Sequence, residues 1–360
     1  MGILFSLLVV AALTAGVYLG VEVMGGYFLF GVVIPYIAFA AFLLGVIYRI
    51  VTWARSPVPF RIPTTCGQQK SLPWIEQNKI DNPSSTAGVI ARMLLEVLFF
   101  RSLFRNTKAQ LVDENGKKVL AYQWEKWLWL AALAFHWSFL IVVIRHLRLF
   151  AEPVPVFVQI LNSVDGMFEF NLQALYLTGV ILLAAVTFLF IRRVVIPQVK
   201  YISLPADYFP LLLIFGIASS GILMRHFMRA DVATVKELML SLFTFNPINP
   251  GDVGIIFYIH LFLVCALLIY FPFSKMTHMA GIFMSPTRNM ANNNRAERHV
   301  NPWNYDVKTH TYEEYEDEFR DRMVPAGLPV DKPLEEKPEP EVEKEIEEVV
   351  EEEKKEAKNE

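Results

Sequence analysis

The residues best suited to chemistry in this 360-residue chain are four histidines in or beside two apolar segments. His136 and His146 lie in one segment, and His260 and His278 lie in and just after the other. An ionisable side chain inside a bilayer is costly, so its presence there indicates a function by default. Two histidines on each of two antiparallel helices predict two stacked sites with two imidazole ligands each, as helical bundles use to hold haem.

The spacing of the histidines predicts how they pair. The ten residues from His136 to His146 span about 15 Å of helix, and the eighteen from His260 to His278 make five turns over about 27 Å, so that both imidazoles share a face. Depth then pairs His146 with His260 and His136 with His278, with helix tilt or a kink near Pro272 absorbing the difference in length. The alternative is that each histidine forms a hydrogen bond between helices.

The elements that position these histidines are long apolar runs. Hydrophobic residues make up 54% of the chain, and a run of about 18 or more can cross a bilayer. Six such runs are predicted spans, at about residues 3–20, 28–51, 127–150, 172–191, 209–227 and 254–273. No basic segment precedes the first run, which favours a retained helix over a cleaved signal peptide. The predicted fold class is all-α, a polytopic transmembrane helix bundle over residues 1–280 with a polar cytoplasmic extension over residues 281–360.

The distribution of charge predicts the orientation of the bundle. Lys and Arg are concentrated in the loop of residues 52–125 and after the fourth and sixth runs, whereas loops 151–171 and 228–253 are acidic. Because basic loops stay on the cytoplasmic side, both termini are predicted to be cytoplasmic in a multi-pass protein of the cytoplasmic (inner) membrane. Residues Val89–Phe104 are predicted to form one amphipathic helix that lies at the membrane surface or against a partner. Residues Glu335–Glu360 contain 13 Glu and 5 Lys, a net charge of −8, which indicates a flexible tail or partner arm.

Cysteine usage limits the cofactors that the chain can hold. Only Cys66 and Cys265 are present, so there is neither a disulfide framework nor a cysteine-rich iron–sulfur motif. No Cys-x-x-Cys-His sequence occurs, so any haem is held without a covalent bond. Cys265 is predicted to pack as a small apolar residue, and Cys66, in a polar loop, has either an incidental or a redox role.

The arrangement of a His-x9-His segment, two further spans and a His-x17-His segment resembles the cytochrome b gamma subunit of respiratory nitrate reductase. It is most similar to the DsrM-type cytochrome b of the sulfite-reductase-associated, Hdr-like menaquinol oxidoreductase complex. The resemblance covers about residues 28–280, and the stretch Thr64–Lys70 is also similar to this branch. It implies that the four histidines at positions 136, 146, 260 and 278 are the axial ligands of two b-type haems.

The resemblance also implies an activity and partners. The chain would be a subunit of a quinol oxidoreductase complex linked to sulfite or sulfate reduction, exchanging electrons between menaquinol at the outer side and a cytoplasmic iron–sulfur (HdrD-like) subunit. Further expected partners are other membrane and periplasmic subunits and the lipid membrane. No binding to nucleic acid is expected. The same residues would serve quinol oxidation or quinone reduction.

The expected quinol site departs from the family pattern. Relatives use a lysine early in the span after the His-x9-His helix, where this sequence offers Asp165, Glu169 and Gln173. Asp165, Glu169 and His226 are therefore the candidate proton acceptors, with His226 alternatively a spare ligand or a surface residue. Arg145 is predicted to bind a haem propionate or the quinol. A different class of function is a haem-free membrane anchor or transporter subunit.

Overall fold

The computed structural model describes residues 2–56, 74–170, 173–293 and 309–334. The chain divides into two compact units, Met1–Trp303 and Asn304–Glu360. The predicted resemblance at Thr64–Lys70, the role of Cys66 and the acidic segment Glu335–Glu360 lie outside the described residues.

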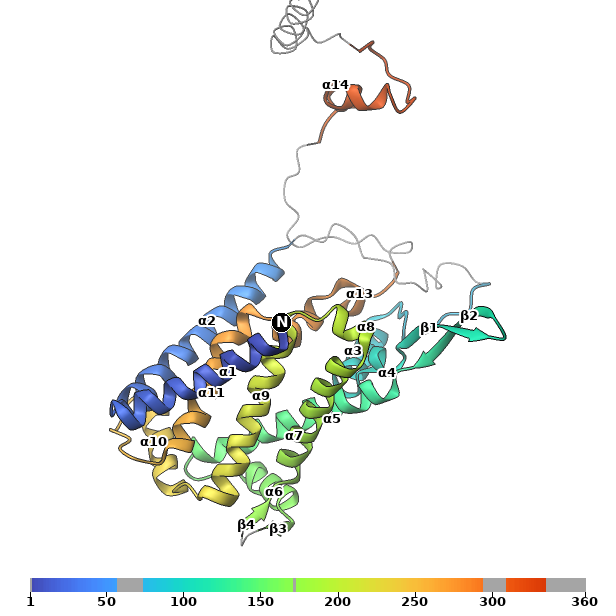
Figure 1. The fold of residues 1–360 in the computed structure, drawn as a ribbon. Helices are drawn as coiled ribbons and strands as arrows, with labels where there is room; N and C mark the ends of the chain where they lie inside the picture. Colours follow the sequence, from blue (N-terminus) through green and yellow to red (C-terminus); the bar gives the residue numbers. More distant parts are fainter. Residues whose placement is uncertain (1, 57–73, 171–172, 294–308, 335–360) are drawn as a thin grey trace, which may run out of the picture. The chain divides into compact units, whose positions relative to one another are not determined.

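The first unit is mainly helical, as predicted, and its described residues include six helices long and apolar enough to cross a membrane (Figure 1). Most of them end in a short 3₁₀ or π turn. They are α1 (Gly2–Tyr18) with η1 (Leu19–Val23), η2 (Leu29–Val33) with α2 (Ile34–Ala54), α5 (Lys126–His146) with η4 (Leu147–Leu149), α7 (Leu177–Val195), α9 (Pro205–Leu223) with η5 (Met224–Met228), and α11 (Ile255–Tyr270) with η6 (Phe271–Phe273).

The six helices pack in a chain of neighbours. α5 contacts α7, α7 contacts α9, and α9 contacts both α1 and α11, while α11 also contacts α2. Leu213 and Ile214 of α9 and Leu263 and Leu267 of α11 are buried in one cluster. Lipid tails are as apolar as these side chains, so close packing rather than exclusion of water holds such helices together.

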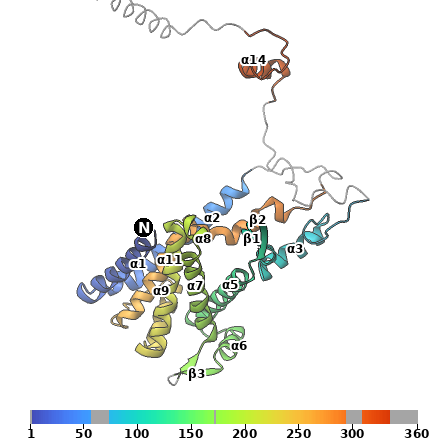
Figure 2. The same ribbon diagram turned by 45° about the vertical axis from the view of Figure 1, so that its right-hand side comes forward.

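Shorter elements cover the two ends of the bundle (Figures 1 and 2). The α6 end carries α6 (Val156–Asp165), the hairpin of β3 (Phe168–Phe170) and β4 (Gln173–Leu175), and α10 (Val232–Phe243). The α3 end carries α3 (Thr86–Phe99), α4 (Arg101–Phe104), the hairpin of β1 (Thr107–Glu114) and β2 (Lys117–Trp124), α8 (Pro197–Tyr201), η7 (Lys275–Thr277), α12 (His278–Gly281), η8 (Ile282–Met284) and α13 (Pro286–Asn289). Because β4 occupies residues 173–175, the fourth span begins at Leu177 rather than near residue 172.

The predicted single helix over Val89–Phe104 is two helices in the structure. Ser85 caps the start of α3 by accepting a hydrogen bond from the Gly88 amide. Phe100 adopts a left-handed conformation with φ of 51°, which ends α3 and allows the chain to turn into α4. The indole nitrogens of Trp129 and Trp137 on α5 donate to carbonyls of the last turn of α3, which holds α3 against the bundle.

The second unit contains α14 (Tyr312–Met323). Thr311 and Glu314 form a reciprocal cap at its start. The buried carboxylate of Glu316 accepts hydrogen bonds from the amides of Asp331 and Lys332 at 2.7 and 2.9 Å, and from Arg320. These hydrogen bonds, above all the one from Asp331, lower the pKa of Glu316 below its ordinary value.

Candidate functional site

The four histidines singled out by the sequence form two pairs. The ring centroids of His146 and His260 lie 6.4 Å apart with an interplanar angle of 13°. Those of His136 and His278 lie 5.9 Å apart with an interplanar angle of 85°. The structure thus brings together the two pairs expected from depth, one toward the α6 end and the other at the α3 end.

Three of the histidines are oriented by their own backbone. The Nδ1 atoms of His136, His146 and His278 lie 2.7, 2.7 and 2.8 Å from a carbonyl oxygen one turn earlier in the chain. A carbonyl can only accept, so each Nδ1 carries the proton. The Nε2 atom of each ring then keeps its lone pair, which is the form of imidazole that binds a metal.

The fourth histidine is oriented by a neighbouring helix. Nδ1 of His260 lies 3.0 Å from the hydroxyl oxygen of Ser220, on α9. The Ser220 hydroxyl donates to the carbonyl of Ile217 at 3.0 Å, so its oxygen accepts from His260 and Nε2 of this ring is also left for a metal. Gly221 leaves room for the His260 ring, since a Cβ at this position would lie 3.2 Å from Cε1 of His260.

The geometry of both pairs fits a haem iron. Metal–nitrogen bonds of about 2 Å on either side of one ion place two imidazole centroids about 6 Å apart, close to the 6.4 and 5.9 Å observed. Two imidazoles on opposite sides are a common axial set for haem in helical proteins. The described residues contain no cluster of three or more His, Cys, Asp or Glu with metal-binding geometry.

His278 reaches His136 by a break in the helix: the kink expected near Pro272 is a complete interruption, so the five-turn spacing of His260 and His278 does not run along one continuous helix. α11 ends at Tyr270, because Pro272 has no N–H with which to continue the α-helical hydrogen bonds. Ser274 is extended, with ψ of 175°, and η7 then leads into α12 at His278. α2 supports the break: Arg49 donates to the Pro272 carbonyl at 3.1 Å. The chain therefore turns before His278, and the two pairs need not differ in height as a straight helix would require.

The segment that follows His278 is fastened to α3 by a buried arginine. The guanidinium of Arg92 donates to the carbonyls of Asp81 at 3.2 Å, Met290 at 3.1 Å and Arg288. Glu96 pairs with Arg288 at 2.9 Å, and both Arg92 and Glu96 are buried. Burial, helped by the nearby charge of Arg288, lowers the pKa of Arg92. We call these residues the α3 latch; no motif in the sequence predicted it.

The candidate quinol residues lie at the α6 end. The carboxylate of Asp165 is buried, pairs with Arg145 at 2.9 Å, and accepts hydrogen bonds from the amide and hydroxyl of Thr178 at 2.8 and 2.6 Å. His226 is buried with its ring centroid 5.7 Å from that of Phe170. Glu169, the residue before Phe170 on β3, is exposed.

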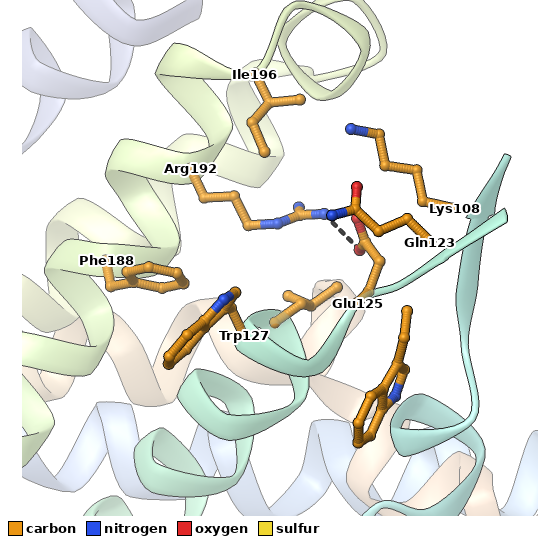
Figure 3. A pocket seen from close by; sticks show the side chains of 9 residues that line it. Lys108, Gln123, Glu125, Trp127, Phe188, Arg192 and Ile196 are labelled. Atoms are coloured by element: carbon orange, nitrogen blue, oxygen red, sulfur yellow. Dashed lines mark hydrogen bonds and ion pairs between the residues drawn. The ribbon is translucent and has the colours of Figure 1, made fainter. Parts of the chain in front are cut away.

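A pocket of about 380 Å³ lies at the α3 end, between the end of β2, the start of α5 and the last turns of α7 (Figure 3). An ion pair of 2.7 Å between Arg192 and Glu125 crosses it, with Trp127 and Phe188 on its apolar side. None of the four paired histidines lines this pocket. It is therefore separate from the chemistry that the histidines indicate.

Comparison with known proteins places this geometry in a family. The sequence model of the nitrate reductase gamma subunit matches residues 93–294, which is more than half of the chain and includes all four histidines. The chain belongs to this family. Within the nitrate reductase gamma family, it is similar to two proteins named Hdr-like menaquinol oxidoreductase cytochrome b-like subunit.

The relative from Archaeoglobus fulgidus is 47% identical over 282 residues, covering 76% of this chain and 83% of the relative. The relative from Archaeoglobus profundus is 46% identical over 277 residues, covering 75% and 81%. The resemblance predicted from the histidine spacing is thus confirmed for the gamma family and for its Hdr-like branch. The matched family segment begins at residue 93, whereas the resemblance was expected from about residue 28, so the first two spans both lie outside it.

Proposed function

We propose that this chain is the membrane dihaem cytochrome b subunit of a menaquinol oxidoreductase complex. The proposal rests on the two imidazole pairs, in which Nδ1 of every ring is in a hydrogen bond and Nε2 is left for iron. His146 and His260 would hold one b-type haem, called here the outer haem, and His136 and His278 the other, the inner haem. When bound, these groups supply reversible one-electron transfer. The names of the two Archaeoglobus relatives support menaquinol as the substrate.

The charge distribution supports an orientation for the reaction. The basic loops of the α3 end would face the cytoplasm, and the acidic loops of the α6 end would face outward in the cytoplasmic membrane, with both termini inside. Menaquinol would then be oxidised beside His146 and His260, and electrons would leave the α3 end beside His278. Electrons moving inward and protons released outward separate charge, at about 2.3 kcal/mol per charge for each 100 mV.

Removing two protons from the quinol requires acceptors at the α6 end. Glu169 is exposed on β3, and His226 lies against the neighbouring Phe170, so these two side chains are suited to receive them. Asp165 already uses both carboxylate oxygens for Arg145 and Thr178. We therefore assign Asp165 to holding Arg145 rather than to accepting a proton.

The electron-accepting partner would be a cytoplasmic iron–sulfur subunit of the HdrD type, assembled with other membrane and periplasmic subunits. This assignment and the link to sulfite reduction rest on the resemblance to the DsrM-type branch. The described part of the chain has no three-ligand metal cluster of its own to act as a further electron carrier.

Haem content of single histidine variants tests the proposal. A pyridine haemochrome assay of the purified chain should give two haems. His146→Ala and His260→Ala should remove one and the same haem from redox-titrated difference spectra, and His136→Ala and His278→Ala the other. His226→Ala is the matched control and should keep both. A purified chain with no b-haem absorbance would instead support the haem-free anchor, and loss of a haem in His226→Ala would refute the ligand assignment.

A further inference from the structure

Three arginines from separate elements converge on one tyrosine at the α6 end. The guanidinium carbons of Arg145 on α5 and Arg225 on η5 lie 3.7 and 4.2 Å from the ring centroid of Tyr176, which precedes α7. Arg148 on η4 donates to the Tyr176 hydroxyl at 2.8 Å. We call Tyr176 and these three residues the arginine cluster.

The arginine cluster carries more positive charge than its surroundings balance. Arg145 pairs with Asp165, and the exposed fractions of the two side chains are only 8% and 6%. Arg225 donates to a neutral group, the carbonyl of Ala174, at 3.0 Å. Within the described residues, neither Arg148 nor Arg225 forms an ion pair with a carboxylate. Three positive charges and one negative charge leave an excess of two.

Arg145 also has hydrogen-bonding capacity to spare. Its Nε atom is buried and has no hydrogen-bond partner among the described residues, while Nη1, also buried, meets Asp165 at 2.9 Å in an ion pair without the geometry of a hydrogen bond. A buried guanidinium without its hydrogen bonds is destabilising, because the lost contacts with water are not replaced. The arginine cluster is therefore suited to an anion with several oxygen atoms and a charge near −2.

The position of the arginine cluster indicates what that anion is. Arg145 directly precedes His146, whose ring pairs with that of His260. Every b-type haem carries two propionate groups, which together supply the missing charge of −2. Arginine is the side chain best matched to carboxylates, because its planar fork can donate two parallel hydrogen bonds.

We propose that the arginine cluster binds the two propionates of the outer haem and raises its reduction potential. The inference rests on the proposed function, since it requires a haem between His146 and His260. Positive charge near the iron favours the reduced state, which carries one positive charge fewer than the oxidised state. The arginine cluster thus makes the outer haem a better acceptor of electrons from the quinol.

Redox titration of the holoprotein tests this inference. Arg148→Gln and Arg225→Gln should each keep two haems and lower the midpoint potential of the outer haem, while the inner haem is unchanged. Asp165→Asn removes the counter-charge and should shift the outer haem in the opposite direction. Arg193→Gln is the matched control: this arginine lies near the other end of α7, pairs with Asp207 at 3.9 Å, and should leave the outer haem unchanged.

A second readout identifies the bound group. In redox-difference infrared spectra of protein containing propionate-labelled haem, the carboxylate bands should shift in Arg148→Gln and Arg225→Gln but not in Arg193→Gln. Lower thermal stability with unchanged potential and unchanged bands would show that the arginine cluster only holds Tyr176, and would overturn the inference. Unchanged bands with weaker binding of a menaquinol analogue would assign the cluster to the quinol and overturn it as well. Failure of the proposed function is recognised separately, because His146→Ala would then retain both haems or the wild type would contain none.

Discussion

The imidazole rings of His146 and His260 are nearly parallel, at 13°, whereas those of His136 and His278 are nearly perpendicular, at 85°. Parallel axial rings split the iron d orbitals that bond with them, and perpendicular rings leave these orbitals almost equal in energy. The ferric protein should therefore give two low-spin electron paramagnetic resonance signals, one rhombic and one highly anisotropic. His136→Ala should lose the highly anisotropic signal and His146→Ala the rhombic one. Two signals of the same type would contradict the observed ring orientations.

A glycine on α9 provides a second test of the outer site. A Cβ at Gly221 would approach Cε1 of His260 to 3.2 Å, which is tighter than ordinary packing. Gly221→Ala should tilt the ring, weaken its hydrogen bond to Ser220 and alter the rhombic signal. Alanine also favours the helix by about 1 kcal/mol relative to glycine, so a loss of haem could not be attributed to a weaker α9.

The matched control lies on the same helix. At Gly216 a Cβ would approach Leu263 to 3.4 Å, an ordinary contact. Gly216→Ala should therefore keep both haems with unchanged spectra. Equal loss of the outer haem in the two variants would refute the view that the absence of a side chain at Gly221 specifically positions the His260 ring.

The sequence predicted the parts of this protein that depend on local signals. Six spans follow from apolar runs, and the pairing of the histidines follows from their depth. The form of the break before His278 was harder to predict. Pro272 is visible in the sequence, but the conformation of the chain around it depends on how closely α2 approaches, and a Cβ on Gly45 of α2 would lie 2.6 Å from the proline ring. Such close packing between distant segments has no signature in either segment alone.

Neither the hairpin of β1 and β2 nor the arginine cluster was predicted, for different reasons. The turn Asn115–Gly116 of the first hairpin, with φ of 55° and 82°, is a hairpin signal that the sequence does carry. Its strands are mostly exposed on both faces and so lack the usual alternation. The arginine cluster could not be predicted for another reason: Arg145 and Arg225 are 80 residues apart, and only tertiary packing brings them to Tyr176.

The second unit should respond to pH through Glu316. The pKa of this carboxyl is lowered in the folded state, so its contribution to stability is present above the ordinary glutamate pKa, about 4.3, and is lost as pH falls through the lower folded value. Hydrogen exchange of the Asp331 and Lys332 amides should be slow at pH 7 and accelerate, after correction for intrinsic rates, below that range. Glu316→Gln should show fast exchange already at pH 7, with Glu318→Gln as the exposed control. Protection that does not depend on pH in the wild type would contradict this role.

The α3 latch should control the inner haem specifically. Arg92→Met leaves the carbonyls of Asp81, Arg288 and Met290 without their donor, and a buried carbonyl left unsatisfied costs about 1–3 kcal/mol. Because the released segment directly follows His278, the highly anisotropic signal should weaken or disappear while the rhombic signal of the outer haem remains. Arg92→Lys, which can still donate to some of these carbonyls, should restore part of the signal.

A nearby arginine separates this effect from a general loss of charge at the α3 end. Arg105 also contacts Asp81, but its side chain is 54% exposed, so Arg105→Gln should leave both haems in place. Haem content and paramagnetic resonance of the three variants would be measured on the same preparations. Loss of the outer haem in Arg92→Met, or equal loss of both, would mean that the latch supports the whole bundle. Selective loss of the inner haem would show that α3, which carries none of the four histidines, positions His278 through the backbone that follows it.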